Sequence, residues 1–416
     1  MKTYAVGGSV RDGIMRNRSN DYDWVVVGST EQEMLDKGFV KVGADFPVFL
    51  HPENGQEYAL ARREKKTGKG YLGFESEFGT DVTIEQDLQR RDISINSIAI
   101  GPIEDPDNVR TIDPYGGEKD IKNKILRHTS DAFQEDPVRV LRIARFRARF
   151  GAEWTVADET KTLIYNMAKT GVLNELTSER VWKEMSRALL EPYPRLFFDT
   201  LLECDALHVV FPEVYRLKTA LESRRWHPEG DAYEHTMLVL TQAAKYGDND
   251  EFKLTLRMCA LTHDFGKGIT PRDKLPKHHG HDVKGVAVVE EFCNRNSVPS
   301  KIKAICMKVC RYHMYGHKLD TLNAKTYVKM FDSIGALNNP EIIDYLYWSF
   351  NCDANGRLGY ENEDYTQEKF VFYDIWNAYR SVKFADVFPN GETNGEKIKQ
   401  TMFRARIASV HKVMKQ

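Results

Sequence analysis

The stretch from residue 4 to residue 27 reads YAVGGSVRDGIMRNRSNDYDWVVV. Two apolar runs flank a Gly-Gly turn and a segment of helix length, so we expect a strand, a short helix and a second strand. Asp21 and Asp23 stand at the head of the second run, and alternate residues of a strand share a face. Both carboxylates should therefore lie together, where a hard divalent cation such as Mg²⁺ would offset their repulsion.

The Gly-Gly turn supplies the second part of this expected site. Gly8 has no Cβ, so backbone N–H groups can come close to a phosphate, and Arg11 can hold a phosphate oxygen. Paired carboxylates and a phosphate cradle are typical of nucleotidyl transfer. Asp-x-Asp by itself is more often a solvated strand start, and the preceding turn is what favours a metal site. Glu57, expected on a neighbouring strand, is a candidate third carboxylate.

Local patterns predict further elements of the fold. Asn54-Gly55 should be a hairpin turn between two strands, and Thr83 with Gln86 should form a capping box that opens a helix through Arg91. From about Asp131 the chain should be helical, with Val140, Leu141, Ala144 and Ala148 on one apolar helix face.

Composition limits the classes of protein. The 59 basic and 61 acidic residues give a net charge of −2, which argues against indiscriminate nucleic-acid binding but allows a local basic surface. Two basic clusters could supply it, the five arginines from Arg139 to Arg149 and the group Arg62, Arg63, Lys65, Lys66 and Lys69. No apolar run is long enough for a membrane span and the chain begins directly with a strand-like segment, so we expect a cytoplasmic protein. The six cysteines should be reduced and buried, and helix core is favoured over zinc binding for Cys306 and Cys310.

Two further motifs suit nucleotide recognition. The run from Arg90 to Asn96, RRDISIN, could hold phosphate and ribose, although a solvated basic helix end would look the same. The run EDPVRVLR that starts at Glu135 is either a well-capped helix or a reader of base edges. Asp136 could accept from the exocyclic amine of cytosine or adenine while Arg139 donates to the adjacent ring nitrogen, which would disfavour uracil and guanine.

Eight of the twelve histidines lie between His227 and His317. A lone histidine is usually a packed or surface residue. The adjacent pair His263-Asp264, with histidines on flanking helices, instead favours a transition metal that activates water for phosphate-ester hydrolysis.

These motifs, in this order, resemble those of the bacterial class II CCA-adding tRNA nucleotidyltransferases in the long form with an appended HD domain, from residue 1 to about residue 355. The resemblance implies an α+β protein. Its expected parts are a small polymerase-beta-like nucleotidyltransferase head (1–130), a helical neck and body for base selection and tRNA binding (131–225), an HD phosphohydrolase domain (226–360) and a helical tail of unknown role (361–416).

The implied activity is template-independent addition and repair of the CCA end of tRNA from CTP and ATP with Mg²⁺ at Asp21 and Asp23. The glycine-punctuated stretch 65–79 would be the flexible loop that switches from C to A. The residues implied to contact the incoming nucleotide are Gly8, Arg11, Arg91, Asp136, Arg139 and Arg142.

For the HD domain the resemblance implies hydrolysis of 2′,3′-cyclic phosphates, 2′-nucleotides and phosphomonoesters, with Ni²⁺ or another transition metal. His281 would serve a second metal or the phosphate. The implied primary ligands are His235, His263, Asp264 and Asp353. Two alternatives stay open: a template-independent poly(A) polymerase, which the histidine-rich segment disfavours, and an HD phosphohydrolase whose head only binds nucleotides. We expect a monomer or a homodimer that binds no membrane.

Overall fold

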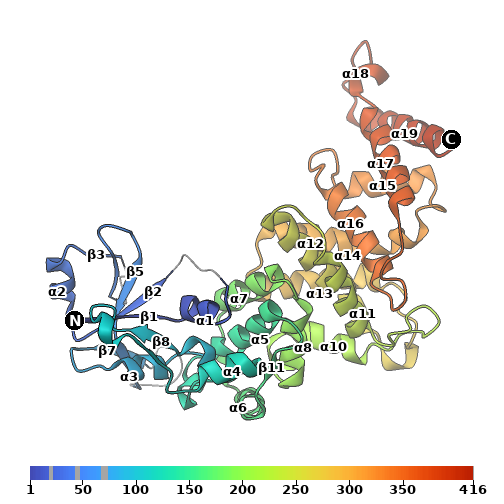
Figure 1. The fold of residues 1–416 in the computed structure, drawn as a ribbon. Coiled ribbons are helices and arrows are strands. Elements are labelled where there is room, and N and C mark those ends of the chain that lie inside the picture. The colour runs from blue at the N-terminus through green and yellow to red at the C-terminus, as the bar shows by residue number, and fades with distance from the viewer. Residues whose placement is uncertain (18–21, 43–46, 67–73, 416) are drawn as a thin grey trace. The chain divides into compact units, whose positions relative to one another are not determined.

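The computed structural model describes residues 1–17, 22–42, 47–66 and 74–415. The chain forms two compact units, Met1–Val210 and Phe211–Gln416. The first carries the strands and the second is helical, which confirms the predicted α+β class (Figure 1). The finer division into parts ending at residues 130, 225 and 360 stays a prediction.

The first unit begins with a mixed sheet whose strand order, within the described residues, is β3-β4-β5-β2-β1-β8-β9. β2 is antiparallel to β1 and parallel to β5. β6 and β7 pair separately as an antiparallel ribbon. The strands are β1 Lys2–Val6, β2 Asp23–Val27, β3 Val40–Lys41, β4 Val48–Leu50, β5 Glu57–Leu60, β6 Arg62–Lys66, β7 Phe74–Phe78, β8 Ala99–Gly101 and β9 Arg110–Ile112.

Each face of the sheet is covered by one apolar cluster. Val25 packs with Leu88 on one face, and the next residue of the strand, Val26, packs with Met34 on the other. This alternation follows from the period of two along a strand. The helices around the sheet are α1 Gly8–Ile14, α2 Glu31–Asp36 and α3 Ile84–Gln89.

Several local predictions are confirmed. α1 follows the Gly-Gly turn, and β4 and β5 form a hairpin around Asn54-Gly55. Thr83 and Gln86 make a reciprocal capping box at the start of α3, although α3 ends at Gln89, two residues earlier than expected.

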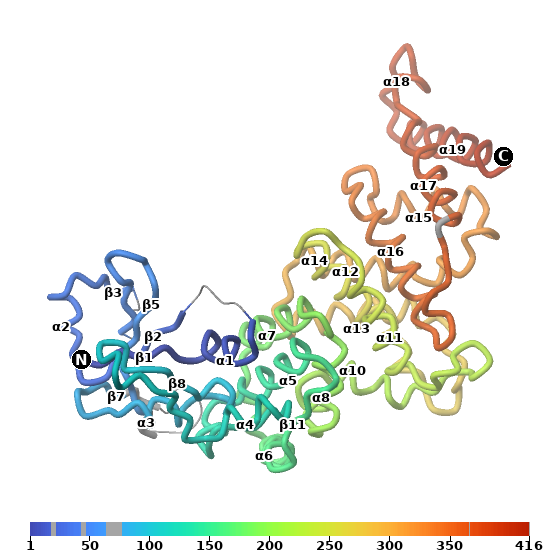
Figure 2. The backbone as a smooth tube through the Cα atoms, viewed as in Figure 1, coloured from blue at the N-terminus to red at the C-terminus, as the bar shows by residue number. Residues whose placement is uncertain are grey.

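The rest of the first unit is mainly helical. Within α5 the predicted apolar face of Val140, Leu141, Ala144 and Ala148 is fully buried, because α5 packs against α7 and α8 (green in Figures 1 and 2). The expectation of helix throughout is wrong at β11, whose Thr155 N–H donates to Lys124 O and so extends a parallel pair with β10. The elements are α4 Gly117–Asn123, β10 Ile125–Leu126, α5 Val138–Phe150, β11 Thr155–Val156, α6 Asp158–Lys169, α7 Ser178–Leu190, α8 Arg195–Glu203 and α9 Leu207–Val210.

The second unit is helical, and its last helix, α19, packs against α15 and α17 (Figure 2). Within the described ranges no helix has both the length and the apolar character that a bilayer span requires. All six cysteines are buried thiols, as predicted. The helices are α10 Pro212–Arg216, α11 Ala232–Ala243, α12 Asp250–Thr262, α13 His281–Arg295, α14 Ser300–Tyr312, α15 Ala324–Ser333, α16 Ile342–Asn355, α17 Thr366–Ser381, α18 Phe384–Val387 and α19 Gly395–Met414.

Two candidate active sites

The Gly-Gly turn brings a carboxylate and a guanidinium together. Gly7 has a φ of 72°, in the left-handed region that favours glycine. A Cβ there would lie 3.0 Å from Arg91 Nη1 and 3.5 Å from Asp23 Oδ2. A Cβ at Gly8 would meet Arg11 Nη2 at an ordinary 3.6 Å. The constrained glycine of this turn is therefore Gly7, which the sequence reasoning did not single out.

The acidic side of this site lies at the start of two parallel strands. Asp21 lies outside the described residues. Asp23 is the first residue of β2 and is exposed. The pairing of Trp24 with Tyr58 places Asp23 level with Glu57, on the same face of the sheet. The first residues of β2 and β5 thus both carry carboxylates, which supply oxygen ligands suited to Mg²⁺, and Glu57 stays a candidate to assist Asp23.

The opposite face of these strands is aromatic. The rings of Tyr22 and Trp24 stack at 5.8 Å, and those of Trp24 and Tyr58 stack at 5.6 Å. The alternation expected for this strand, with Asp23 on one face and its two aromatic neighbours on the other, is therefore present.

A buried chain of polar contacts connects α1 to α5. Arg11, only 3% exposed, donates through Nη1 to Asn96 Oδ1 at 2.6 Å. Asn96 donates to Asp92 Oδ1 at 3.0 Å, and Arg142 donates to Asp92 Oδ2 at 2.8 Å. The segment from Arg90 to Asn96 is therefore not a solvated helix end. Through Asn96 and Asp92 it links Arg11 to Arg142, two of the predicted nucleotide contacts, and we call this set of hydrogen bonds the Asp92 connector.

Along this connector, burial and neighbouring charges shift the pKa values of Asp92 and Arg11 in opposite directions. Burial raises the pKa of Asp92, but the charge of Arg142 and the hydrogen bonds from Asn96 and Arg142 hold it below its ordinary value. Burial also lowers the pKa of Arg11, while Asp12 raises it. Asp92 is therefore an ionised anchor for Arg142.

Asp136 stands two positions before the first residue of α5, and both of its carboxylate oxygens accept hydrogen bonds. Oδ1 accepts from the Val138 N–H at 3.1 Å, and Oδ2 accepts from Arg180 Nη2 at 2.7 Å. Arg139 is buried and donates through Nη1 to Ala132 O at 2.5 Å. Arg180, on α7, was not singled out from the sequence because nothing local to it signals a partner 44 residues away.

The arginines of α5, on which a basic surface for tRNA was expected, have acidic partners. Arg145 donates to Glu184 at 2.7 Å, Arg147 lies 2.7 Å from Glu203, and Arg149 lies 3.4 Å from Asp12. These cationic side chains thus pair with acidic residues of their own unit, and the tRNA-binding surface expected on this helix stays a prediction.

The predicted C-to-A loop, 65–79, falls partly outside the described residues. Residues 67–73 are not described. On either side of them β6 pairs with β7, from Arg62 opposite Phe78 to Lys66 opposite Phe74.

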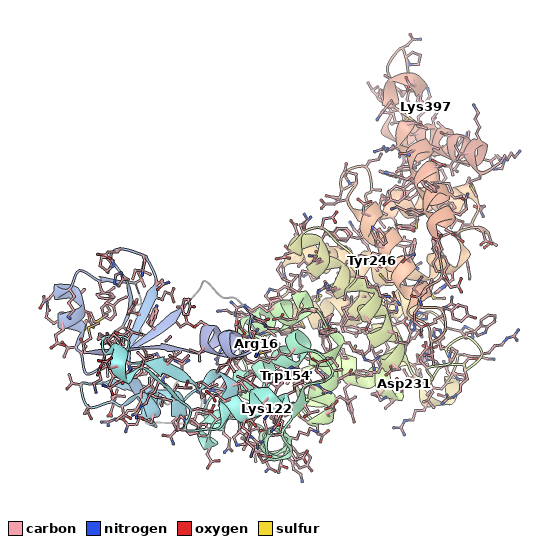
Figure 3. All side chains as sticks on the ribbon, in the orientation of Figure 1. Arg16, Lys122, Trp154, Asp231, Tyr246 and Lys397 are labelled. Atoms are coloured by element: carbon pink, nitrogen blue, oxygen red, sulfur yellow. The ribbon has the colours of Figure 1, made fainter. Side chains whose placement is uncertain are left out.

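In the second unit, the ends of several helices gather the predicted HD residues. Asp231, labelled in Figure 3, accepts from the Glu234 N–H and so caps α11, the helix that carries His235. His263-Asp264 follows α12, His281 opens α13, and Asp353 lies near the end of α16.

All five predicted HD residues converge in the structure, and all are buried. His235 Nε2 lies 3.0 Å from Asp353 Oδ1. His263 Nε2 lies 3.2 Å from Asp264 Oδ2, and His281 Nε2 lies 3.2 Å from Asp264 Oδ1. Side chains spread over more than a hundred residues of sequence thus share one polar centre.

Two further histidines belong to this centre. His313 Nε2 lies 3.3 Å from Asp264 Oδ1 and 3.0 Å from His281 Nε2. His317 Nε2 lies 3.1 Å from Asp353 Oδ2. The only sequence signal for either residue was the density of histidines in this part of the chain.

Two groups of possible ligands overlap at Asp264. In each group the ligand atoms lie within 4.8 Å of one another. The first group is His235, His263 and Asp264, and the second is Asp264, His281 and His313. A carboxylate shared in this way can bridge two cations.

Hydrogen bonds fix which imidazole nitrogen faces the centre. The Nδ1 atoms of His263, His281 and His313 lie 2.8, 2.8 and 2.7 Å from the backbone carbonyls of Ala260, His278 and Cys310, respectively. His235 Nδ1 lies 3.1 Å from Glu229 Oε1. Each Nδ1 is thus placed to donate to one of these oxygens, and each Nε2 is directed at the centre, the orientation usual for metal-binding histidines.

The donor set fits a metal cation. His263 Nε2 and both carboxylate oxygens of Asp264 are buried and, among the described residues, have no partner with hydrogen-bonding geometry. Buried polar atoms are normally satisfied, so a ligand for all three is expected here. Burial raises the pKa of Asp264, but Lys267, 2.7 Å away, and His263 hold it well below its usual range. A cation at this centre would therefore meet an ionised carboxylate.

A cavity of about 1110 Å³ opens beside this centre. Asp264, His281, His313 and Asp353 line it, together with Trp226. The buried ligands are thus reachable by a small molecule.

Three known protein families match successive segments of the chain. Residues 3–127 match the poly A polymerase head domain, residues 154–217 match the probable RNA and SrmB-binding site of polymerase A, and residues 232–337 match the HD domain.

Solved structures of similar fold cover nearly all of the chain. A CCA-adding enzyme in complex with ATP aligns at a TM-score of 0.64 and 18% identity, over 98% of this chain and 86% of that one. The Thermotoga maritima CCA-adding enzyme complexed with tRNA aligns at 0.63 and 17%, over 100% and 90%. The Bacillus stearothermophilus enzyme in complex with CTP aligns at 0.60 and 17%, over 98% and 88%. These matches confirm the predicted resemblance: the chain joins a poly(A) polymerase head domain to an HD domain, and its fold is that of the CCA-adding enzymes.

Proposed function

We propose that the first unit adds the CCA end to tRNA from CTP and ATP without a nucleic-acid template. The observation that carries this proposal is the turn at Gly7, which brings the Asp23 carboxylate and the Arg91 guanidinium to one point. The similar structures with ATP, CTP and tRNA support the same substrates.

Each residue has a role in this reaction. Arg91 would hold the triphosphate, together with Arg11 once its guanidinium leaves Asn96 and Asp12. Asp21 and Asp23 would hold Mg²⁺, assisted by Glu57, which lies level with Asp23. When bound, Mg²⁺ favours attack by the tRNA 3′ hydroxyl and offsets charge on the leaving pyrophosphate. The reaction joins the 3′ oxygen to the α-phosphorus and releases pyrophosphate.

Base choice rests on Asp136 and Arg139. Asp136, fixed by Arg180 and by the start of α5, accepts from the exocyclic amine of cytosine or adenine. Arg139 donates to the ring nitrogen after it leaves the Ala132 carbonyl, which it contacts in this structure. Uracil and guanine present the opposite pattern of donors and acceptors and are disfavoured. Arg142 is held by Asp92 at the same end of α5.

For the second unit we propose phosphate-ester hydrolysis at the HD centre, with 2′,3′-cyclic nucleotides, 2′-nucleotides and phosphomonoesters as substrates. Two transition-metal ions, Ni²⁺ among the candidates, would be held by the two ligand groups that share Asp264. Such ions supply an activated water and offset phosphate charge when bound. Asp264 and Asp353 hold negative charge at the centre, and Glu229 orients His235.

The polymerising activity is tested with tRNA that ends at the discriminator base. The protein and an Asp21→Ala variant are incubated with Mg²⁺ and labelled CTP, ATP or both, and product length is read on a gel. Two C and one A added by the wild type alone support the proposal. A long A tail supports a poly(A) polymerase, and no incorporation by either protein supports a head that only binds nucleotides.

A protein that acts on tRNA is expected in the cytoplasm.

A further inference from the structure

The loop 221–231, which precedes α11, is a closed and well-tied hairpin. Leu221 and Asp231 form a β-bridge, and the Glu222 N–H donates to Gly230 O at 3.0 Å. Inside the loop, Arg224 donates to Pro228 O at 3.3 Å. The backbone of this loop is therefore fixed.

Two carboxylates tie the loop to the HD centre. Glu222 accepts from Lys267 Nζ at 2.6 Å, and Lys267 also pairs with Asp264. Glu229 lies 3.1 Å from His235 Nδ1, and His227 bridges the two carboxylates at 3.3 and 2.9 Å. The position of the loop is thus set by the residues that hold the proposed metals.

At the tip of this fixed loop Trp226 is 60% exposed and lines the cavity of the HD centre. All six tryptophans lie in the described part of the chain, and the other five are buried or half-buried. Exposing an indole forgoes the stabilisation that burial of its ring would give. Loop flexibility does not account for this exposure, because the loop is closed and anchored at both carboxylates.

The surroundings of Trp226 suit a planar, anionic ligand. The Arg225 guanidinium lies 4.9 Å from the centre of the indole ring. An aromatic face beside an arginine is the arrangement on which nucleic-acid bases stack. The cavity is larger than a phosphate group needs, and its volume slightly exceeds the range of about 300 to 1,000 Å³ usual for small-molecule sites.

We propose that Trp226 is the nucleobase platform of the HD site: the base of a nucleotide substrate stacks on the indole while its phosphate ester lies at the Asp264 centre. This inference rests on the proposed phosphohydrolase function and adds its ligand class. A nucleotide substrate would therefore contact both Trp226 and the metal centre, whereas a phosphomonoester without a base would contact the metal centre alone.

The test compares a substrate with a base and one without. For Trp226→Ala, KM for adenosine 2′,3′-cyclic phosphate should rise about tenfold or more, as expected for loss of one stacked base. Its kcat, and kcat/KM for p-nitrophenyl phosphate, should stay within about twofold of the wild type. Trp226→Phe should restore most of the lost affinity. Phe370→Ala replaces an equally exposed aromatic residue (60%) on α17 and is the matched control. It should leave KM and kcat for both substrates unchanged.

Binding of adenosine 2′-monophosphate, measured by calorimetry, separates this inference from the phosphohydrolase proposal. Weaker binding of the monophosphate by Trp226→Ala supports the platform, whether or not the wild type hydrolyses either substrate. A wild type that hydrolyses neither substrate would overturn only the proposed hydrolysis. Equal loss on both substrates would show that the loop merely supports the metal ligands. Unchanged KM and unchanged binding of the monophosphate would overturn the platform outright.

Discussion

Arg180 on α7 holds the carboxylate of Asp136 at 2.7 Å, although the two residues lie 44 positions apart in the chain. With the Val138 N–H on the other oxygen, this contact fixes the plane of the carboxylate that we propose reads the incoming base. Base selection by a protein requires an acceptor that cannot rotate, because a carboxylate free to turn would also accommodate the wrong donor pattern.

Replacing Arg180 should therefore relax selectivity more than it slows the reaction. For Arg180→Met we expect the preference for CTP over UTP to fall about tenfold, or ~1.4 kcal/mol, since the pair is only partly exposed to solvent. The measurement is single-nucleotide addition to a tRNA acceptor with each triphosphate in turn. Arg187→Met, a more exposed arginine of the same helix, is the control. Selectivity unchanged from the wild type would remove Arg180 from base selection.

The Asp92 connector should stabilise α1 and α5 in a pH-dependent way. The pKa of folded Asp92 lies below its unfolded value of about 3.9, so its contribution is fully present above about pH 4 and is lost as the pH falls. Asp92→Asn should lower the opening free energy of α5 by about 2 kcal/mol at pH 7 and by less at pH 3.

Hydrogen exchange of α5 amides, corrected for intrinsic rates, measures this difference at the two pH values. Asp107→Asn, at an exposed position, should leave α5 exchange unchanged at both. An equal effect of Asp92→Asn at pH 7 and pH 3 would contradict a role for the ionised carboxylate.

Glu229 should tune the affinity of the HD centre for metal. It lies 3.1 Å from the Nδ1 of His235, and partners of this kind orient metal-binding histidines and strengthen their basicity. Glu229→Gln keeps the shape of the side chain and removes its charge, so Ni²⁺ affinity measured by calorimetry should fall about 10- to 100-fold. Glu291→Gln, on the exposed face of α13, is the control. Equal affinities in all three proteins would show that Glu229 only supports the loop.

The sequence predicted what depends on neighbours along the chain. The hairpin at Asn54-Gly55, the capping box at Thr83 and the buried face of α5 follow from turn chemistry, capping and periodicity. The order of the motifs also predicted that the five HD residues act together, and in the structure their side chains lie at one centre.

What the sequence could not supply was the partner of each charge. Five arginines along one helix looked like a nucleic-acid surface, but tertiary packing places Glu184, Glu203 and Asp12 against them. Periodicity locates a side chain on its own helix and says nothing of the helix that covers it. For the same reason Arg180 and His313 were not assigned roles, and Gly7, with its left-handed φ, could not be distinguished from Gly8 without the backbone.

The proposed function gives one chain two independent centres, one that polymerises and one that hydrolyses. It is tested most directly by assaying Asp23→Asn and Asp264→Asn, two isosteric variants, in both reactions: CCA addition to tRNA, and hydrolysis of adenosine 2′,3′-cyclic phosphate. We predict that Asp23→Asn loses CCA addition by at least about 100-fold and keeps hydrolysis, and that Asp264→Asn does the reverse. CCA addition that survives in Asp23→Asn, or hydrolysis that survives in Asp264→Asn, would contradict the account.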